Sequence, residues 1–187
     1  MEKILPFAKS LLQKAVKSGD VVIDATLGNG HDTAFLAELV GSNGQVFGFD
    51  VQQEAIEATN QRLRELDFSW VTLFHSGHEN IINKIPANTH GRVKGAIFNL
   101  GYLPGSDKTI VTRPETTISA IQQLLEVLAP EGIIVVVIYH GHEEGQIERD
   151  SVLEFCRDLD QKTAHVLQYQ FINQQNHPPF IIAIEKR

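Results

Sequence analysis

The chain has 187 residues, of which 42% are hydrophobic and 21% charged, and its formal net charge is −7 at pH 7. This length and composition are typical of one globular domain, residues 1–187, with enough apolar side chains for a core. The negative charge argues against extensive nonspecific binding of polyanions, and the single Cys156 excludes an internal disulfide and a cysteine-based zinc site.

No stretch approaches the roughly 20 apolar residues of a membrane span. Pro6, Lys9 and Ser10 interrupt the first apolar run, which argues against a signal peptide. We therefore expect a cytoplasmic protein without a membrane partner.

The first half of the chain alternates helical and extended patterns of apolar residues. The first helical segment carries four lysines, which indicate either a solvated helix face, the interpretation we favour, or a local basic patch. These lysines are Lys3, Lys9, Lys14 and Lys17. The sequence predicts helices over 5–17, 32–41 and 53–66, and strands over 21–25, 45–50 and 70–74.

The second half continues the alternation, with the most apolar strand at 132–139. A long loop at 100–114, rich in Gly, Pro, Ser and Thr, favours a functional role over a plain connection. The remaining predicted elements are strands at 95–99, 164–172 and 180–185 and helices at 115–128 and 144–160. This order predicts a doubly wound, mostly parallel α/β sheet with helices on both faces.

The clearest motif is a glycine turn at residues 24–33, directly after the first predicted strand. Gly28 and Gly30 allow close approach of a ligand to the backbone, and Asp50 ends the second predicted strand. Strand, glycine turn, helix and an acid on the next strand together predict a nucleotide cradle. A plain strand–helix turn and a nicotinamide site remain as alternatives.

The acids of this motif indicate which nucleotide binds. Asp24 and Asp32 would repel a pyrophosphate, whereas they would attract a ligand that carries an ammonium and a sulfonium. S-adenosylmethionine (SAM) is such a ligand, and Asp50 would accept hydrogen bonds from both of its ribose hydroxyls.

Two further loops follow predicted strands. Gly77 and His78 lie after the third strand, where we expect them to border the adenine, unless this is an ordinary loop with solvated histidines. Asn99 ends the fourth strand in a turn that resembles the Asn-Pro-Pro-Tyr loop of amino methyltransferases. Its amide oxygen and the carbonyl of Leu100 could each accept an N–H and aim an amine lone pair at the methyl group. The alternative for Asn99 is a strand-end cap.

The segments beside these loops offer contacts for a substrate. Thr112 and Glu115 have the spacing of a helix capping box, while Arg113 and Lys108 could hold phosphates. A stretch at 139–143 offers Tyr139 for stacking on a base and His140 for accepting a proton, unless His140 is a strand-end histidine whose hydrogen bonds are satisfied within the protein. A metal site is the weaker interpretation of that stretch, since its spacing matches no standard signature. That site would use His140, His142, Glu143 and His177.

The motifs at 24–33, 99–108, 116–117 and 139–142 resemble a small bacterial family once labelled rRNA methylases and now assigned as tRNA 5-(aminomethyl)-2-thiouridine methyltransferases. The resemblance covers nearly the whole chain. It implies a class I SAM-dependent methyltransferase domain with a seven-stranded sheet and an antiparallel last strand. It also implies a homodimer that methylates the aminomethyl group of the wobble uridine, in the anticodon region of tRNA.

We therefore expect a SAM-dependent tRNA methyltransferase without a metal. The rival interpretations are an amine methyltransferase for a small molecule or protein, a non-catalytic SAM-binding module and a nicotinamide oxidoreductase. The catalytic candidates are Asn99, Tyr139 and His140. The cofactor-binding candidates are Asp24, Gly28, Asn29, Gly30, Asp32, Thr33, Asp50, Gln52, Gly77, His78, Asn99 and Gly101. The substrate-binding candidates are Tyr102, Lys108, Arg113, Thr116, Tyr139 and His140.

Overall fold

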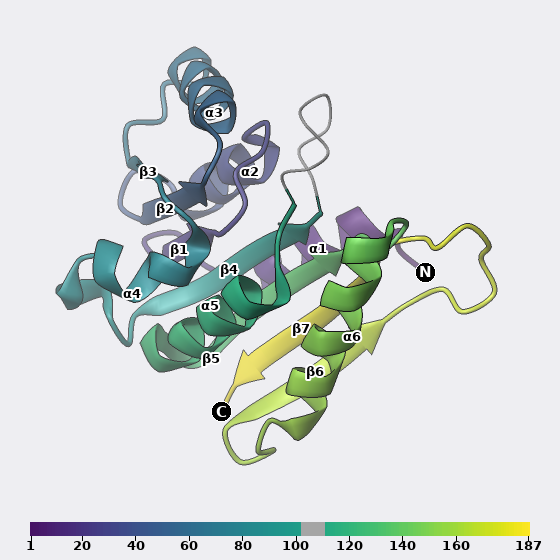
Figure 1. Ribbon diagram of the computed structural model, residues 1–187. Coiled ribbons are helices and arrows are strands. Elements are labelled where there is room, and N and C mark those ends of the chain that lie inside the picture. The colour runs from purple at the N-terminus through teal and green to yellow at the C-terminus, as the bar shows by residue number, and fades with distance from the viewer. Residues whose placement is uncertain (102–110) are drawn as a thin grey trace.

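The computed structural model of the protein describes residues 1–101 and 111–187. Within these ranges the chain forms a seven-stranded sheet with the order β3-β2-β1-β4-β5-β7-β6 (Figure 1). Strands β1 to β5 run parallel, and β7 is antiparallel to both of its neighbours. The predicted fold class is therefore confirmed. The strands are β1 (Val21–Asp24), β2 (Gln45–Asp50), β3 (Val71–His75), β4 (Val93–Leu100), β5 (Leu128–Ile138), β6 (Ala164–Tyr169) and β7 (Phe180–Lys186).

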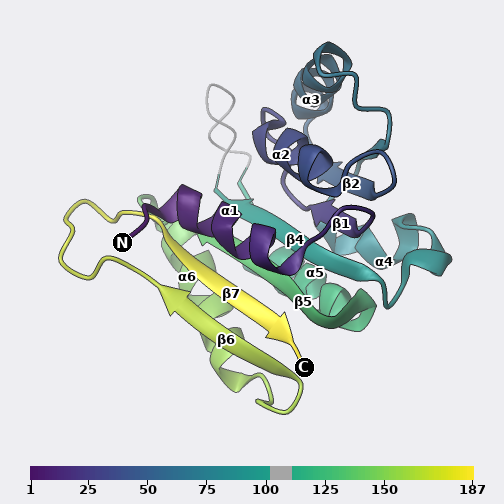
Figure 2. The same cartoon turned by 180° about the vertical axis from the view of Figure 1, so that it is seen from behind.

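Helices cover both faces of the sheet (Figures 1 and 2). Helices α4, α5 and α6 pack on one face, and α1 and α2 pack on the other, while α3 contacts α2, β2 and β3. Every helix in the described ranges is too short or too polar to cross a bilayer. The helices are α1 (Ile4–Ala15), α2 (His31–Val40), α3 (Gln53–Glu65), α4 (Ile81–Lys84), α5 (Pro114–Val127) and α6 (Glu143–Asp158), with short 3₁₀ turns η1 (His78–Asn80) and η2 (Ala87–Thr89).

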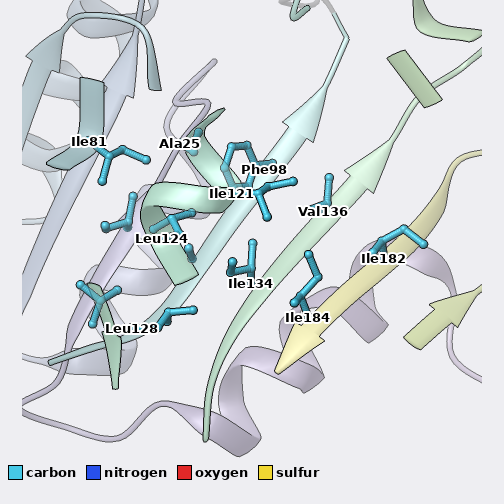
Figure 3. Packing of buried hydrophobic residues seen from close by; sticks show 14 of the residues in the cluster. Ala25, Ile81, Phe98, Ile121, Leu124, Leu128, Ile134, Val136, Ile182 and Ile184 are labelled. Atoms are coloured by element: carbon cyan, nitrogen blue, oxygen red, sulfur yellow. The ribbon is translucent and has the colours of Figure 1, made fainter. Parts of the chain in front are cut away.

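The central strand β5 shows why the core has two layers. Successive side chains of a strand point to opposite faces, so Ile134 and Val136 pack with Ile121 of α5 (Figure 3). On the other face Val135 belongs to the cluster that contains Leu12 of α1. Full burial of one such side chain stabilises the fold by about 1.5–3 kcal/mol, which makes this continuous apolar run the anchor of the sheet.

Some predicted boundaries were wrong. Strand β5 begins at Leu128 rather than at residue 132, because Leu128 pairs with Val93 beyond a register shift in β4. Strand β6 ends at Tyr169 rather than at residue 172. Tyr169 lies opposite Ile181, and β7 begins only one residue earlier, so the following residues of the turn have no ladder to join.

The sheet topology creates a crevice. Strand β1 lies between β2 and β4, and the chain leaves β1 toward one side and β4 toward the other. Ligands of open α/β sheets bind outside the carboxyl ends of the strands at such a switch point. The residues that follow β1, β2 and β4 are therefore expected to surround a ligand.

Candidate active site

Two adjoining cavities lie at the carboxyl ends of β1, β2 and β4. The first has a volume of about 470 Å³ and is lined by residues such as Asp50, His78 and Arg113. The second has a volume of about 750 Å³ and is lined by residues such as Asp32 and Tyr139. We call them the first and second pockets. They share Thr26, Gly28, Asn99 and Gly101, so these residues surround the passage between them.

The carboxylate of Asp50 is fixed at the end of β2 in the first pocket. Its Oδ2 accepts a hydrogen bond from the backbone N–H of Gly28 at 3.1 Å, and its Oδ1 accepts one from Gln52 at 2.9 Å. A carboxylate oxygen can accept further bonds. The arrangement therefore holds Asp50 against the glycine turn and leaves acceptor capacity for a ligand hydroxyl.

Asp24 lies beneath the glycine turn, not on the surface of either pocket. It is fully buried, and it accepts hydrogen bonds from Thr33 Oγ1 at 2.6 Å and from the backbone N–H of Thr26 at 3.2 Å. Burial first, and then the charge of Asp32, raise the pKa of Asp24 to about 7. The expectation that Asp24 and Thr33 contact the ligand is corrected: both are buried and support the loop from below.

Gly30 also acts as a support and lines neither pocket. Its φ of 73° is left-handed, and an added Cβ would lie 2.9 Å from Thr59 Cα, so only glycine fits where the turn packs against α3. From the same helix, Arg62 Nε donates to the carbonyl of Asn29 at 2.9 Å. Helix α3 thus fixes the path of the loop, whereas Gly28 and Asn29 face the pockets.

His78 borders the first pocket. Its Nδ1 lies 3.0 Å from the carbonyl of Ala25, and because a carbonyl only accepts, Nδ1 carries the hydrogen. Burial lowers the pKa of His78, which keeps the ring neutral at pH 7. Its buried Nε2 has no hydrogen-bond partner among the described residues. This nitrogen is therefore an acceptor whose hydrogen bond is not satisfied by the described residues. Gly77 lines the same pocket.

Asn99 lies at the passage between the pockets and is fixed by two contacts. Its backbone N–H donates to Thr26 Oγ1 at 2.7 Å, and its Nδ2 donates to Asp32 Oδ2 at 2.8 Å. An ionised carboxylate can only accept, so the contact with Asp32 determines which side of the amide carries nitrogen. The amide oxygen of Asn99 is thereby oriented as an acceptor. The carbonyl of Leu100 already accepts a bond from the backbone N–H of Tyr139 at 3.3 Å.

The second pocket contains residues that sequence reasoning missed. Leu5 and Lys9 of α1 line it, and Lys9 Nζ lies 3.5 Å from Asp32 Oδ1. The interpretation of Lys9 as part of a solvated helix face was wrong, because the packing of α1 on the sheet turns it toward the crevice. Thr26 was also missed, although it lies inside the glycine motif and lines both pockets.

Tyr139 directly follows β5, lines the second pocket and is 37% exposed. Burial and then the charge of Asp32 raise the pKa of its phenol, so the side chain is neutral at pH 7. A neutral, partly exposed aromatic ring at the pocket wall is suited to stacking on a base.

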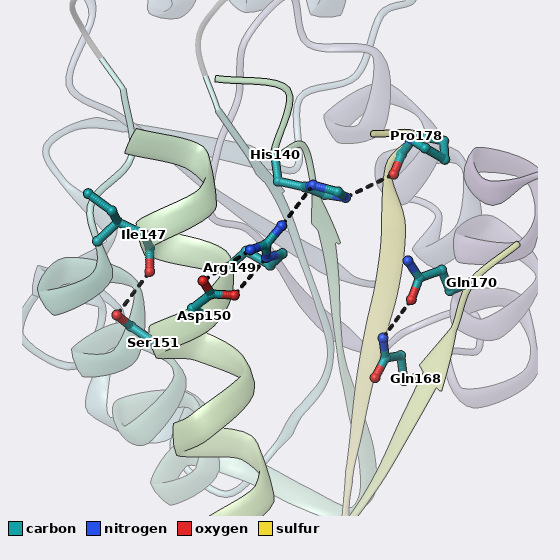
Figure 4. A network of polar contacts seen from close by, with 8 residues as sticks. All are labelled: His140, Ile147, Arg149, Asp150, Ser151, Gln168, Gln170 and Pro178. Atoms are coloured by element: carbon teal, nitrogen blue, oxygen red, sulfur yellow. Dashed lines mark hydrogen bonds and ion pairs between the residues drawn. The ribbon is translucent and has the colours of Figure 1, made fainter. Parts of the chain in front are cut away.

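His140 has both of its ring nitrogens engaged (Figure 4). Nδ1 lies 3.3 Å from Arg149 Nη1, which can only donate, and Nε2 lies 3.1 Å from the carbonyl of Pro178, which can only accept. Burial and then the Arg149 charge lower the pKa of His140. The neutral ring thus connects the end of β5 to α6 and to the turn before β7 through these two hydrogen bonds. Because both nitrogens are engaged, the prediction that His140 accepts a proton is corrected. His140 does line the second pocket, and its contact with the substrate stays a prediction.

Gly101 and Thr112, which flank the loop, are held in place by the buried Glu148. Thr112 and Gly101 exchange two hydrogen bonds, of 3.1 Å and 3.0 Å. Thr112 Oγ1 also donates to Glu148 Oε2 at 2.5 Å, and Thr117 Oγ1 donates to Glu148 Oε1 at 2.7 Å. Burial raises the pKa of Glu148. The predicted capping box is wrong, because Thr112 bonds to Glu148 while Arg113 occupies the cap position of α5 without a side-chain bond.

Arg113 and Thr116 line the first pocket, whereas Tyr102 and Lys108 lie outside the described residues. Within residues 1–101 and 111–187, no three His, Cys, Asp or Glu side chains gather in a way that could hold a metal ion. This part of the structure gives no support to the metal interpretation of the 139–143 stretch.

Comparison with known proteins identifies the family. The model of the family described as "Putative rRNA methylase" matches residues 46–185. A chloroplastic tRNA (mnm(5)s(2)U34)-methyltransferase from Arabidopsis thaliana is 33% identical over 194 residues, which cover 99% of this chain and 70% of that protein.

Two solved structures resemble the whole chain. One, from Clostridium thermocellum and described as a "putative rRNA-methylase", is 48% identical with a TM-score of 0.96, over 100% of this chain and 99% of that one. The other, a "putative methyltransferase" from Streptococcus mutans in complex with SAH, is 37% identical with a TM-score of 0.90, over 100% and 99% of the two chains. The chain therefore belongs to the rRNA methylase family and is a SAM-dependent methyltransferase.

Proposed function

We propose that this enzyme methylates the exocyclic amine of 5-aminomethyl-2-thiouridine at the wobble position of tRNA and so forms the methylaminomethyl nucleoside. The observation that carries the proposal is the match of 99% of the chain to the Arabidopsis enzyme, whose name specifies that product at position 34. The site chemistry agrees with it, because the amide of Asn99, an acceptor for the N–H of an amine, lies where the two pockets meet.

We propose that the first pocket holds the adenosine of SAM, which supplies a methyl group on a sulfonium. Asp50 and Gln52 would bind the ribose hydroxyls, and Gly77 would let the adenine approach the backbone. The orphaned Nε2 of His78 supports this assignment, since it is a buried acceptor that the exocyclic amine of adenine can satisfy. Gly28, Asn29 and Gly101, with Asp32, would hold the methionine end.

Asn99 is the proposed catalytic residue. Its oriented amide oxygen would accept an N–H of the substrate amine and so direct the nitrogen lone pair toward the methyl carbon. Methyl transfer from a sulfonium is an in-line displacement, so orientation of the amine is the main task of the protein. Tyr139 would stack on the uridine from the wall of the second pocket.

The remaining substrate contacts belong to the loop and its flanks. We propose that Arg113 and Lys108 hold tRNA phosphates and that Tyr102 and Thr116 contact the substrate beside them. We also propose that residues 1–187 act as one domain, in a homodimer, in the cytoplasm. Sedimentation of the purified protein would test the dimer.

Mass spectrometry of nucleosides tests the reaction. Purified enzyme and SAM are incubated with tRNA that carries aminomethyl-thiouridine, and in parallel with rRNA and a metabolite extract. The proposal expects a gain of one methyl on that tRNA nucleoside, and its absence with Asn99→Ala. Methylation found only in rRNA, only in the metabolite extract, or nowhere despite bound SAM would refute it.

A further inference from the structure

An ion pair between α1 and α2 lies in the wall of the second pocket. Lys9 Nζ is 3.5 Å from Asp32 Oδ1, and the two side chains are 38% and 18% exposed. The Lys9 ammonium also lies 4.9 Å from the centre of the Phe35 ring, which favours its position through a cation–π contact. Both charged residues line the pocket, so a ligand there meets a positive and a negative group side by side.

The contacts of Asp32 make this pair a fixed feature of the pocket. One carboxylate oxygen faces Lys9, and the other accepts the bond from Asn99 Nδ2 at 2.8 Å. The Lys9 ammonium has three N–H groups, of which the contact with Asp32 uses one. The pair can therefore bind a further anion at Lys9 and a further cation at Asp32 without being separated.

We propose that Lys9 and Asp32 together recognise the α-amino acid end of SAM, with Lys9 pairing with its carboxylate and Asp32 with its ammonium. Lys9 is then a residue that determines the specificity of the donor site. The inference rests on the proposal above that the methionine end lies beside Asp32, which lines the second pocket. It adds a contact from α1, which the glycine motif does not contain.

The charges of the pair favour a zwitterion over simpler ions. A phosphate drawn to Lys9 would be repelled by Asp32, and a lone ammonium drawn to Asp32 would be repelled by Lys9. An α-amino acid carries a carboxylate and an ammonium on the same carbon. It can thus satisfy both members of the Lys9–Asp32 pair at once.

Isothermal titration calorimetry without RNA tests the assignment. Wild type, Lys9→Met and Lys9→Arg are titrated with SAM, with decarboxylated SAM and with 5′-methylthioadenosine, which lacks the amino acid end. Lys14→Met is the matched control, because it removes the same charge from an exposed position of the same helix. Thermal melts establish that each variant is folded.

We expect Lys9→Met to weaken SAM binding by about tenfold to a hundredfold, the loss of one charge-assisted contact. Binding of decarboxylated SAM should be unchanged or tighter, since Asp32 is then free of Lys9, and 5′-methylthioadenosine should be unaffected. Lys9→Arg should keep the preference for SAM, and Lys14→Met should resemble wild type.

Equal weakening of all three ligands by Lys9→Met would assign Lys9 a structural role and overturn the inference. Unchanged SAM binding in Lys9→Met would overturn it as well, even if tRNA binding fell. Because the assay contains no RNA, either result leaves the proposed tRNA substrate to its own test. Conversely, methylation of a different acceptor would refute that substrate while the ligand preference of Lys9 stands.

Discussion

The amide of Asn99 cannot rotate freely, because Asp32 holds its nitrogen and Thr26 holds its backbone. Replacing Asn99 with Ala removes the acceptor that would orient the amine but leaves the backbone contacts that fix Asp50, the proposed ribose ligand, in place. We predict that Asn99→Ala lowers kcat by about 10²-fold, the cost of a misplaced reacting group, while the Kd for SAM changes by less than about threefold. Single-turnover assays and calorimetry measure the two quantities, and equal losses in both would give Asn99 a purely structural role.

Asp24 provides a prediction about pH and stability. Its pKa in the folded protein is about 7, above the ordinary value of 3.8. The folded state therefore binds the proton of Asp24 more tightly than the unfolded state does, and this difference stabilises the fold. The contribution is fully present below pH 3.8 and is lost as the pH rises through 7. At 1.36 kcal/mol per pKa unit the loss is at most about 4 kcal/mol.

Asp24→Asn keeps the shape of the side chain and cannot ionise. We predict that between pH 5 and 8 the free energy of unfolding falls less in Asp24→Asn than in wild type, as measured by urea denaturation. Parallel pH profiles for the two proteins would show that Asp24 has an ordinary pKa.

Sequence reasoning reached the residues that end strands and missed those that depend on tertiary packing. Asp50 and Asn99 could be found because a parallel sheet brings the ends of its strands to one edge. Lys9 faces the crevice only because α1 crosses the sheet, and the nitrogens of His140 are engaged by α6 and by the turn before β7. No local pattern encodes such contacts.

Helix α6 contributes to the site through Glu148, although it lines neither pocket. Glu148 binds Thr112 and Thr117 and thereby fixes the wall formed by Gly101. We predict that Glu148→Ala destabilises the protein by about 1–3 kcal/mol, because two hydroxyls lose a buried partner. It should also raise the KM for tRNA more than the Kd for SAM.

The matched control is Glu154→Ala, an exposed acid on the same helix, whose effect on stability should stay within about 0.5 kcal/mol. Urea denaturation and steady-state kinetics give the comparison. If Glu148→Ala were as stable and as active as Glu154→Ala, the contacts of Glu148 with Thr112 and Thr117 would have no role at this site.

The periodicity of apolar residues predicted the type and order of the main helices and strands. The predicted boundaries differ from the observed ones where pairing between strands decides where a strand begins. Leu128, for example, belongs to β5 because it pairs with Val93 of β4. The cap of α5 was wrong for the same reason, since Thr112 prefers a buried carboxylate from α6 over its own helix. The spacing of residues along the chain cannot predict that a residue from another helix will take this hydrogen bond.

The net charge of −7 restricts how the complete chain can bind RNA. Because 23 Asp and Glu outnumber 16 Lys and Arg, we expect few phosphate contacts and a shallow dependence of tRNA affinity on salt. Arg113→Ala should weaken tRNA binding and reduce the slope of log K against log salt by about one, as expected for one lost phosphate contact. Fluorescence anisotropy over a salt series measures this slope, and an unaltered slope would remove Arg113 from the phosphate contacts.

The account depends on two adjoining pockets that bring donor and acceptor together at Asn99. A crystal structure of the enzyme with SAH and a 5-aminomethyl-2-thiouridine nucleoside examines this arrangement directly. We predict adenosine beside Asp50 and His78, and the substrate amine within hydrogen-bond distance of Asn99 Oδ1. Adenosine bound outside the first pocket, or an amine bound away from Asn99, would contradict the account.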